Sequence, residues 1–526
     1  MGLKTTENWT IRKPAVASAT GMVASQHFMA SDVGASILAS GGNAVDAAIA
    51  TGLALGVVEP WMSGLGGGGY MTVYLASEDR VRVIDFGMRA PFDACQEDYP
   101  LAASGTNSSD AFNWPQVKGD ANVEGPLSIA VPGYLRGIEL ALEQFGTCTW
   151  KALLEPACHL AERGLPIDWF SAQKINQWAR PLNRYAETRR TYLSDGLPPV
   201  ARLDGCFDFI PLGNLASTLR SIQTEGSRAF YAGSLTASIC QDLATAGSRI
   251  SAEDLASYEA HVTEPLSTDY RGAQLYVSGN LTAGPSIIQA LDELQRQWSP
   301  GGSPDADTYI AYARALRSTY EYRLNSLGEG HDGDNPGNTS HVCVADSQGN
   351  VVSLTQTIMS AFGSRVMLPG TGILMNNGMM WFDPRPGGPN AIVGGRRPLC
   401  NMCPVILKGA DESVTAIGAC GGRKIFPAVF QLTSFLTDFG MDVDTAVHTP
   451  RLDVSGTDLV TLMSHLEEAT ISRLQREFTH VVVRDNGVNP NLFALPQIIR
   501  LDRQGHASGG CFVPSPHAAV SLPASG

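Results

Sequence analysis

The chain is 526 residues long, with 44% hydrophobic and 17% charged residues. This balance is typical of a globular protein with a large buried core and argues against an intrinsically disordered chain. The 37 basic and 51 acidic residues give a formal net charge of −14. Such a field repels phosphate backbones and anionic lipid, so we expect neither a nucleic-acid partner nor a membrane partner.

The N-terminal stretch "MGLKTTENWTIRKPAV" contains no apolar segment of signal-peptide length, and no long uninterrupted apolar stretch follows it. The ten cysteines are scattered and too sparse for a disulfide scaffold. We therefore expect a cytoplasmic protein with reduced, mostly buried thiols.

Between Ala30 and Glu59 the sequence is rich in Ala, Leu and Val, with Gly41-Gly42-Asn43 in the middle. This pattern predicts two deeply buried helices separated by a tight turn. The "SGLGGGGYMTVYLA" that follows lacks the Gly-Lys-Ser/Thr ending of a phosphate-binding loop. A packed turn that enters a core strand is therefore the favoured interpretation.

Helical patterns dominate from Gly133 to about Pro300, including "YLRGIELALEQF", "ASYEAH" and "SIIQALDELQRQW". The polar, turn-forming stretch 327–338 then predicts an exposed loop or a boundary. Beyond it the pattern favours strands at 341–346, 351–357, 403–408 and 414–418. The composition therefore changes at Thr339.

A β-hairpin is predicted where "SHVCVA" and "VVSLTQT" flank the turn residues 346–350. A three-residue loop that ends in Gly349 suits a type I turn completed by a left-handed residue. If Asp346 pairs with Asn350, the same register continued along both strands places Thr339 opposite Thr357. A bulge would shift this pairing by one residue.

Thr339 has an ordinary explanation as the start of a strand, but it also follows "NPGN", a loop that suits cleavage. A threonine hydroxyl is a weak nucleophile unless a base accepts its proton, and a free α-amine on the same residue can be that base. The amine exists only after the Asn338–Thr339 bond is cut. The hydroxyl can start that cut by attacking the preceding carbonyl, and spacing alone leaves both interpretations open.

Several motifs in order resemble one known family along nearly the whole chain. They are "GGNAVDAAIATGLALGVVEP" with "SGLGGGGYM", "VPGYLRG", "NTSHVCVAD", "GILMNNGM", "RRPLCNMCP" and "GACGGRKI". The family is that of the γ-glutamyltransferases (glutathione hydrolases), which are N-terminal-nucleophile hydrolases. The resemblance implies an α/β fold, an αββα sandwich built by both segments of a self-cleaved precursor. The large segment 1–338 and the small segment 339–526 would stay associated as one intertwined catalytic unit, with no cofactor and no metal.

The resemblance also implies the catalytic roles. Thr339 would cut the chain after Asn338 and then serve as the nucleophile, with its own α-amine as the general base. Thr357 would hold the nucleophile's hydroxyl by a hydrogen bond. The N–H groups of Gly421 and Gly422 would stabilise the oxyanion, although a Gly-Gly pair is also a common tight turn.

The positions that bind the substrate's amino-acid end depart from the family pattern. Typical members have Arg-Glu-x-Ala-Pro where this chain has "GMRAP", so Gly87 replaces the carboxylate-binding arginine. Arg89, two residues later, either reaches the same carboxylate from another direction or is a surface arginine.

The groups that would bind an α-ammonium also differ. Gly378 and Trp381 stand where polar groups are expected, and Met359 replaces an asparagine. The family's serine pair becomes Cys400-Asn401, in which Asn401 retains hydrogen-bonding capacity. An ammonium beside apolar groups would lose hydration without a charged partner, and a cation–π contact with the indole would restore about 0.5 to 2 kcal/mol.

We therefore expect an amidohydrolase that cleaves a small carboxylate or acyl amide, such as oxamate, through an acyl-enzyme. Arg89, Met359, Trp381, Cys400 and Asn401 are the candidate substrate-binding residues. One alternative is a γ-glutamyltransferase with a rebuilt substrate clamp. A second alternative is an uncut, inactive scaffold of the same fold. The sequence leaves the oligomeric state of the protein open.

Other site chemistries are less well supported. Cys400 and Cys403 form a C-x-x-C, but no second pair at metal-binding spacing accompanies them. No G-x-S-x-G elbow of a serine hydrolase occurs. His341 shares the predicted strand face of Thr339, so it is either a site residue or a hydrogen-bonded core histidine.

Overall fold

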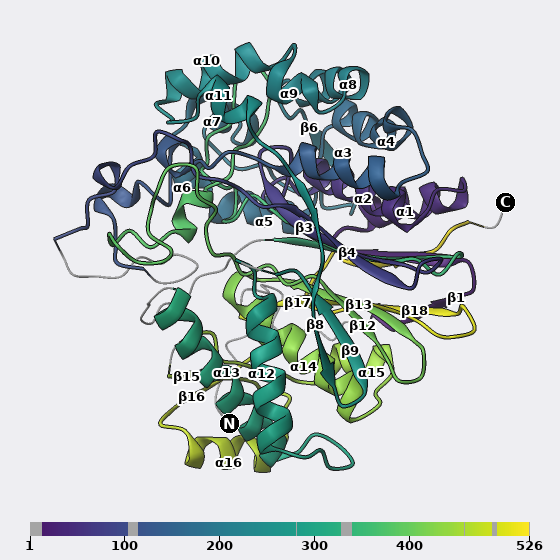
Figure 1. Cartoon of the computed structure of the whole chain (residues 1–526). Helices are drawn as coiled ribbons and strands as arrows, with labels where there is room; N and C mark the ends of the chain where they lie inside the picture. The colour runs from purple at the N-terminus through teal and green to yellow at the C-terminus, as the bar shows by residue number, and fades with distance from the viewer. Residues whose placement is uncertain are drawn as a thin grey trace.

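Two seven-stranded sheets lie face to face between layers of helices (Figure 1). This computed structural model describes residues 13–103, 114–279, 281–327, 339–456, 458–485 and 492–524. The pairings between neighbouring strands in both sheets are antiparallel. The predicted αββα sandwich is therefore confirmed.

Both sheets combine strands from before and after Thr339. The sheet that carries this residue's strand runs in the order β19 (Ala519–Ser521), β2 (Gly21–Ser25), β10 (Ser340–Asp346), β11 (Val351–Thr357), β3 (Gly68–Leu75), β4 (Arg80–Phe86) and β7 (His261–Thr263). The facing sheet runs in the order β1 (Val16–Ser18), β18 (Ala507–Cys511), β17 (Leu495–Leu501), β13 (Val414–Cys420), β12 (Val405–Lys408), β9 (Ala273–Val277) and β8 (Leu266–Tyr270).

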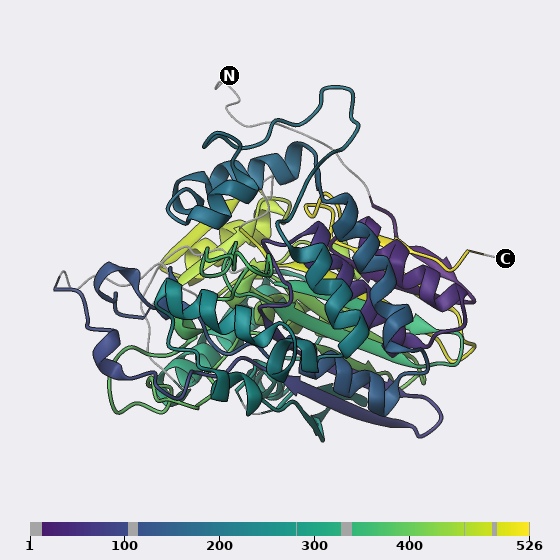
Figure 2. The same ribbon diagram turned by 90° about the horizontal axis from the view of Figure 1, so that it is seen from above.

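Helices cover the outer face of each sheet. The β10 sheet is covered by α1 (Phe28–Ala39), α2 (Ala44–Val58) and α3 (Tyr134–Phe145), which lie over its strands in the view from above (Figure 2). Against the other sheet pack α12 (Gly284–Gln297), α14 (Ile425–Asp438) and α15 (Val443–His448).

The remaining elements surround this sandwich. The helices are α4 (Trp150–Arg163), α5 (Trp169–Gln177), α6 (Ala179–Leu182), α7 (Ala186–Tyr192), α8 (Leu215–Glu225), α9 (Arg228–Ala232), α10 (Thr236–Ala246), α11 (Ala252–Ala256), α13 (Ala306–Leu327) and α16 (Glu468–Glu477). The short strands are β5 (Leu165–Ile167), β6 (Asp208–Ile210), β14 (Leu452–Asp453), β15 (Leu459–Met463) and β16 (His480–Arg484).

Helix α2 is the centre of the helical layer. Its side chains are buried on every face, as expected of a helix that is apolar all round. A capping box starts it: the Asn43 side chain accepts from the amides of Val45 and Asp46, and the Asp46 carboxylate accepts from the amide of Asn43. The two helices and the turn between them are confirmed, but only α2 is deeply buried: α1 buries five of its twelve residues and exposes Asp32, Ser36 and Ala39 on its other face.

The predicted hairpin has the predicted register. The Asp346 amide donates to the Asn350 carbonyl at 3.1 Å, and Gly349 has φ +90°. Pairing continues without a bulge to Ser340 opposite Gln356. One more step of the same register places Thr339 opposite Thr357.

The two sheets meet closely where β10 and β11 cross β13. The His341 ring packs on Gly418, where a Cβ would lie 2.1 Å from the ring. The Cys343 thiol lies 3.6 Å from the Ala416 carbonyl oxygen, and Ser353 donates to the Ile417 carbonyl at 3.1 Å. A glycine at 418 is therefore required by this approach.

The helical interpretation of residues 133–300 was wrong in part. "ASYEAH" is not a helix, because α11 ends at Ala256 and the Tyr258 hydroxyl then anchors the chain to the Gly87 carbonyl at 2.6 Å. The chain leaves this anchor extended and forms β7, and β8 and β9 then join the sheet opposite. The side chains of β9 alternate between buried and half-buried, a period of two that the helical pattern nearby obscured.

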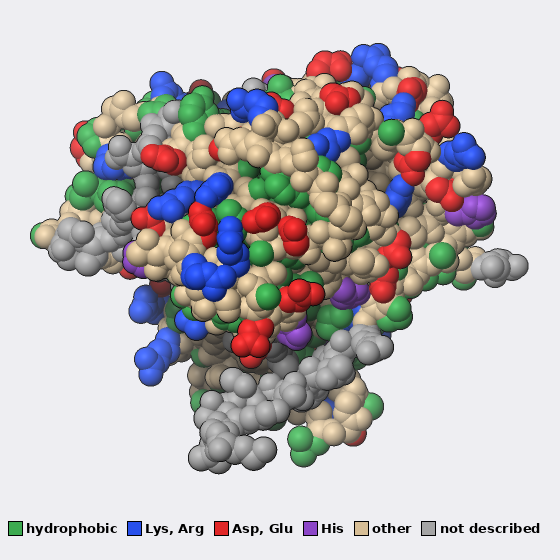
Figure 3. All heavy atoms as spheres, turned by 90° about the horizontal axis from the view of Figure 1, so that it is seen from below, with side chains coloured by type: hydrophobic (Ala, Val, Ile, Leu, Met, Phe, Trp, Pro, Cys, Tyr) green, Lys and Arg blue, Asp and Glu red, His purple; other side chains and the backbone are tan. Residues whose placement is uncertain are grey.

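The described residues carry no helix that is long and apolar enough to cross a bilayer. On the face seen from below, acidic and basic side chains are interspersed (Figure 3). All ten cysteines are free thiols, and six of them are buried.

The close approach at Gly418 gives a first prediction. Gly418→Ala places a methyl group against the His341 ring, so we expect a loss of about 2 to 3 kcal/mol in the free energy of unfolding, measured by urea denaturation. Gly302→Ala is the control, because a Cβ there meets nothing within 4 Å. Its effect should stay within about 1 kcal/mol, and equal effects of the two substitutions would contradict the packing argument.

Candidate active site

Thr339 lies at the entrance to β10 with only 4% of its surface exposed. His341 and Cys343 on the same strand point between the two sheets, and alternation puts the Thr339 side chain on that face. Asn338, the other side of the predicted cut, lies outside the described residues, as does most of the predicted loop 327–338.

Thr357 ends β11 and is 1% exposed. Its hydroxyl oxygen accepts a hydrogen bond from the Met359 amide at 2.7 Å. Met359 has φ +87°, a left-handed conformation that is costly for a residue with a side chain. The hydroxyl of Thr357 therefore stabilises a strained turn in addition to facing the position of Thr339.

The glycine pair follows β13 directly. Gly421 has φ +138° and Gly422 has φ +59°, conformations that favour glycine. Among the residues that the structure describes, neither of their N–H groups donates a hydrogen bond. Both groups are thus available to a developing oxyanion.

The contacts between β10 and β13 place this turn relative to Thr339. Cys343 of β10 contacts Ala416 of β13, and His341, two residues earlier on β10, contacts Gly418, two residues later on β13. One further step takes Thr339 to the level of the last residue of β13, directly before the glycine pair.

His341 is a hydrogen-bonded core histidine. Its Nδ1 lies 2.9 Å from the Thr355 hydroxyl and its Nε2 lies 3.2 Å from the Cys343 thiol. Burial lowers its pKa to about 3, so the ring is neutral at any working pH. Its backbone amide donates to the Gln26 Oε1 at 2.5 Å.

Three of the predicted substrate-binding residues are buried in one large hydrophobic core cluster. Met359, Trp381 and Cys400 are each less than 5% exposed and belong to a single hydrophobic cluster. The same cluster holds Met88, Ala130, Met379, Met380, Met402 and Cys403.

Asn401 supplies a buried polar group directly after Cys400 in the chain. It is 3% exposed, and its Nδ2 has no hydrogen-bond partner within the described part of the chain. A buried amide donor usually has a hydrogen-bond partner, so Asn401 Nδ2 is a candidate donor to a bound group.

Arg89 is engaged elsewhere. Its guanidinium donates to the Asp254 carbonyl at 2.9 Å and to the Ser257 hydroxyl at 3.0 Å, and it lies over the Phe92 ring. These contacts occupy the Arg89 guanidinium, and its role in orienting substrate stays a prediction. At Gly87 a Cβ would meet the Tyr70 hydroxyl at 2.6 Å, so no larger side chain fits there unless Tyr70 moves.

Two buried asparagines that precede the 378–381 segment were missed as site residues. The Asn376 amide donates to the carbonyls of Gly66 and Ala130, and its Oδ1 accepts from the amides of Ala130 and Gly378. Asn377 bonds Ser360 in the same manner. Two adjacent asparagines inside an apolar run could have indicated this role from the sequence, because buried amides must be hydrogen-bonded.

An unexpected buried carboxyl lies behind the glycine turn. Glu59 is 4% exposed, and burial raises its pKa to about 8 against the opposing charge of Lys174. Both charges act on the Cys420 thiol, whose pKa is raised to about 12 by burial. No cluster of three or more potential metal-ligating groups occurs in the described ranges.

The gamma-glutamyltranspeptidase family model matches residues 30–334 and 310–511, most of the chain. The chain belongs to this family. Gamma-glutamyltranspeptidase family members similar to it include the glutathione hydrolase proenzyme of Bacillus subtilis (strain 168), 32% identical over 488 residues that cover 82% of this chain and 80% of that protein. The acylase ACY 1 proenzyme of Pseudomonas sp. (strain SE83) is 32% identical over 526 residues, which cover 93% of this chain and 92% of that protein.

Solved structures agree with this assignment. The cephalosporin acylase from Bacillus halodurans superimposes over all of both chains with a TM-score of 0.84 at 25% identity. The gamma-glutamyltranspeptidase of Helicobacter pylori covers 61% of this chain and 86% of its own, with a TM-score of 0.51 at 29% identity. The protein is therefore an enzyme of the N-terminal-nucleophile hydrolase class, which comprises hydrolases and acyltransferases.

Glu59 gives a prediction for the pH dependence of stability. Its pKa is about 8 in the folded state and about 4.5 in the unfolded state, so between these values only the unfolded state releases the proton. Stability contributed by the protonated form is thus lost as the pH rises from about 4.5 to 8.

Glu59→Gln replaces the titrating carboxyl group with an amide of nearly the same shape. From pH 5 to pH 8, the free energy of unfolding of the wild type should fall by about 2 to 4 kcal/mol more than that of the variant. Urea denaturation at both pH values measures the difference. Identical pH dependence would show that Glu59 is ionised in the folded protein.

Proposed function

We propose that this enzyme is a self-processing threonine amidohydrolase that hydrolyses small carboxylate or acyl amides, such as oxamate, in preference to γ-glutamyl compounds. The observation that carries the proposal is the burial of Met359, Trp381 and Cys400 in one hydrophobic cluster, followed by Asn401, whose buried Nδ2 has no partner among the described residues. These side chains suit an acyl chain with one carbonyl or carboxylate handle, and none of the four is an anion that could pair with an α-ammonium group.

The first reaction is the cut of the chain itself. The Thr339 hydroxyl attacks the Asn338 carbonyl carbon, the C–N bond breaks, and the acyl group moves from nitrogen to oxygen. Water then hydrolyses the ester, which leaves a carboxylate on Asn338 and a free α-amine on Thr339. The register of β10 and β11, which sets Thr357 opposite Thr339, supports this assignment of roles.

Turnover repeats the same chemistry on the substrate. The α-amine of Thr339 accepts the hydroxyl proton as the oxygen attacks the amide carbon, and the N–H groups of Gly421 and Gly422 bind the oxyanion. The leaving amine takes the proton, and the acyl ester remains on the enzyme. Water, deprotonated by the same α-amine, releases the acid; loss of one oxyanion donor generally costs about 3 to 4 kcal/mol.

A γ-glutamyltransferase activity is the second candidate, because the glutathione hydrolase of Bacillus subtilis is as similar in sequence as the acylase is. It requires a binding site for the α-ammonium group. Each charge-assisted hydrogen bond that the apolar side chains of Met359 and Trp381 do not supply is worth about 1.5 to 3 kcal/mol. Two such losses weaken binding by roughly 10² to 10⁴.

Self-cleavage is tested with Thr339→Ala, which removes the hydroxyl that attacks the Asn338 carbonyl. We expect the variant to remain a single chain on a denaturing gel, whereas the wild type separates into segments 1–338 and 339–526. Thr339→Ser is the matched control, because it keeps the hydroxyl and should still be cut. If Thr339→Ala splits at the same bond, an external protease makes the cut.

The substrate preference is tested with two anilides that differ only in the α-amino group. The processed enzyme should hydrolyse glutaryl anilide with a kcat/KM at least tenfold above that for γ-glutamyl anilide, because the ammonium would be desolvated beside Trp381 and Met359. Oxamate and glutathione extend the same comparison. A tenfold preference for the γ-glutamyl compounds would refute the proposed substrate class while leaving the Thr339 mechanism intact.

A further inference from the structure

A chain of buried hydrogen bonds lies behind the start of β10. The Gln356 amide nitrogen donates to the Gly52 carbonyl and to the Ser63 hydroxyl, both at 2.9 Å. Ser63 in turn donates to the Ser340 hydroxyl at 2.9 Å. All three side chains are at most 1% exposed, and the chain ends on the residue that directly follows Thr339.

This network lies on the helix side of its sheet. Ser340 and Gln356 face each other in the β10–β11 register, and both point toward α2. Thr339 and Thr357, one position further along each strand, point between the sheets. The network therefore cannot touch a substrate that Thr339 attacks, and any effect it has on the reaction must act through position.

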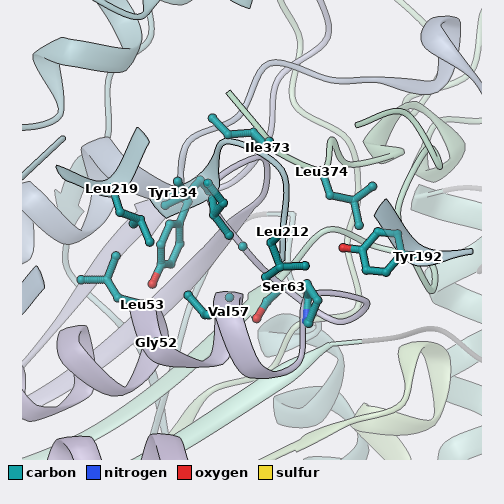
Figure 4. A pocket seen from close by; sticks show the side chains of 16 residues that line it. Gly52, Leu53, Val57, Ser63, Tyr134, Tyr192, Leu212, Leu219, Ile373 and Leu374 are labelled. Atoms are coloured by element: carbon teal, nitrogen blue, oxygen red, sulfur yellow. The ribbon is translucent and has the colours of Figure 1, made fainter. Parts of the chain in front are cut away.

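The rear of the network opens into an apolar cavity (Figure 4). The cavity walls are mainly aliphatic and are formed by Leu53, Val57, Leu212, Leu219, Ile373 and Leu374. The Tyr134 hydroxyl and the Gln356 side chain are buried at this end and interact with each other. Burying polar groups in such apolar surroundings costs stability, and a fully apolar filling would avoid that cost.

Gly52 makes room for the two polar groups. A Cβ on this residue would lie 2.4 Å from the Gln356 Oε1 and 2.8 Å from the Tyr134 hydroxyl. Gly52 lies inside α2, where alanine would favour the helix. The chain thus gives up helix stability at the one position where a methyl group would displace the Gln356 amide.

We propose that Gln356, Ser63 and Ser340 are positioning residues that hold Thr339 in its reactive geometry, an inference that rests on the proposed function of Thr339. Once the chain is cut, Thr339 is a terminus, and terminal residues fray unless they are tied down. The Ser63–Ser340 bond ties the next residue to the turn between α2 and β3. A displacement of the nucleophile by about 1 Å is enough to lower a rate by about 10².

The decisive variant is Ser63→Ala, which removes the donor to Ser340. We expect kcat to fall 10- to 100-fold while KM changes less than twofold, and self-cleavage to slow. Ser63→Thr keeps the hydroxyl and should restore most of kcat. Thr51→Val is the matched control, and kcat should stay unchanged. It removes a buried hydroxyl on α2 that, among the described residues, bonds only the Ala47 carbonyl of its own helix.

Gly52→Ala tests the same network without removing any polar group, and it decides the question alone if Ser63→Ala does not fold. It should lower kcat with KM unchanged, because the added methyl group displaces the Gln356 amide. Wild-type kcat in Gly52→Ala and in any folded Ser63→Ala would overturn the positioning role, even where Thr339→Ala abolishes turnover. Turnover by Thr339→Ala would instead refute the proposed function itself.

Discussion

The antiparallel register of β10 and β11 is the constraint on which the rest of the site depends. Because side chains alternate along a strand, one register assigns every residue of the hairpin to one of two environments. Thr339, His341 and Thr357 are directed between the sheets, while Ser340 and Gln356 are directed at α2. A slip by one residue would exchange the two sets, and the nucleophile would face the helices.

The sequence was sufficient for features that short stretches of chain specify. The loop of the hairpin needs a left-handed residue, and Gly349 supplies it. Asn43 and Asp46, three residues apart, form the capping box that starts α2. These preferences act within a few residues, so they can be recognised without knowledge of the fold.

Features that join distant parts of the chain could not be predicted in this way. The partner of Ser340 is Ser63, 277 residues earlier, and the partner of Asn376 is Ala130, 246 residues earlier. Serine or asparagine alone gives no sign of which group it will meet. The same reason explains why Arg89 was a reasonable candidate from its motif, although the fold brings it to α11 instead.

The alternation of strands from both sides of Thr339 has a consequence for the cleaved form that we propose. Residues before the cut form the neighbours of β10 and β11 on both sides, β2 and β3, and residues after it form the centre of each sheet. The two pieces alternate in groups of neighbouring strands, so each piece supplies part of both sheets of the shared core. Unfolding the cleaved enzyme would then separate the two pieces, so the midpoint of unfolding would depend on protein concentration. The lifetime of the folded enzyme would be set by the rate at which the two pieces first open, and not by an equilibrium between two states of one chain.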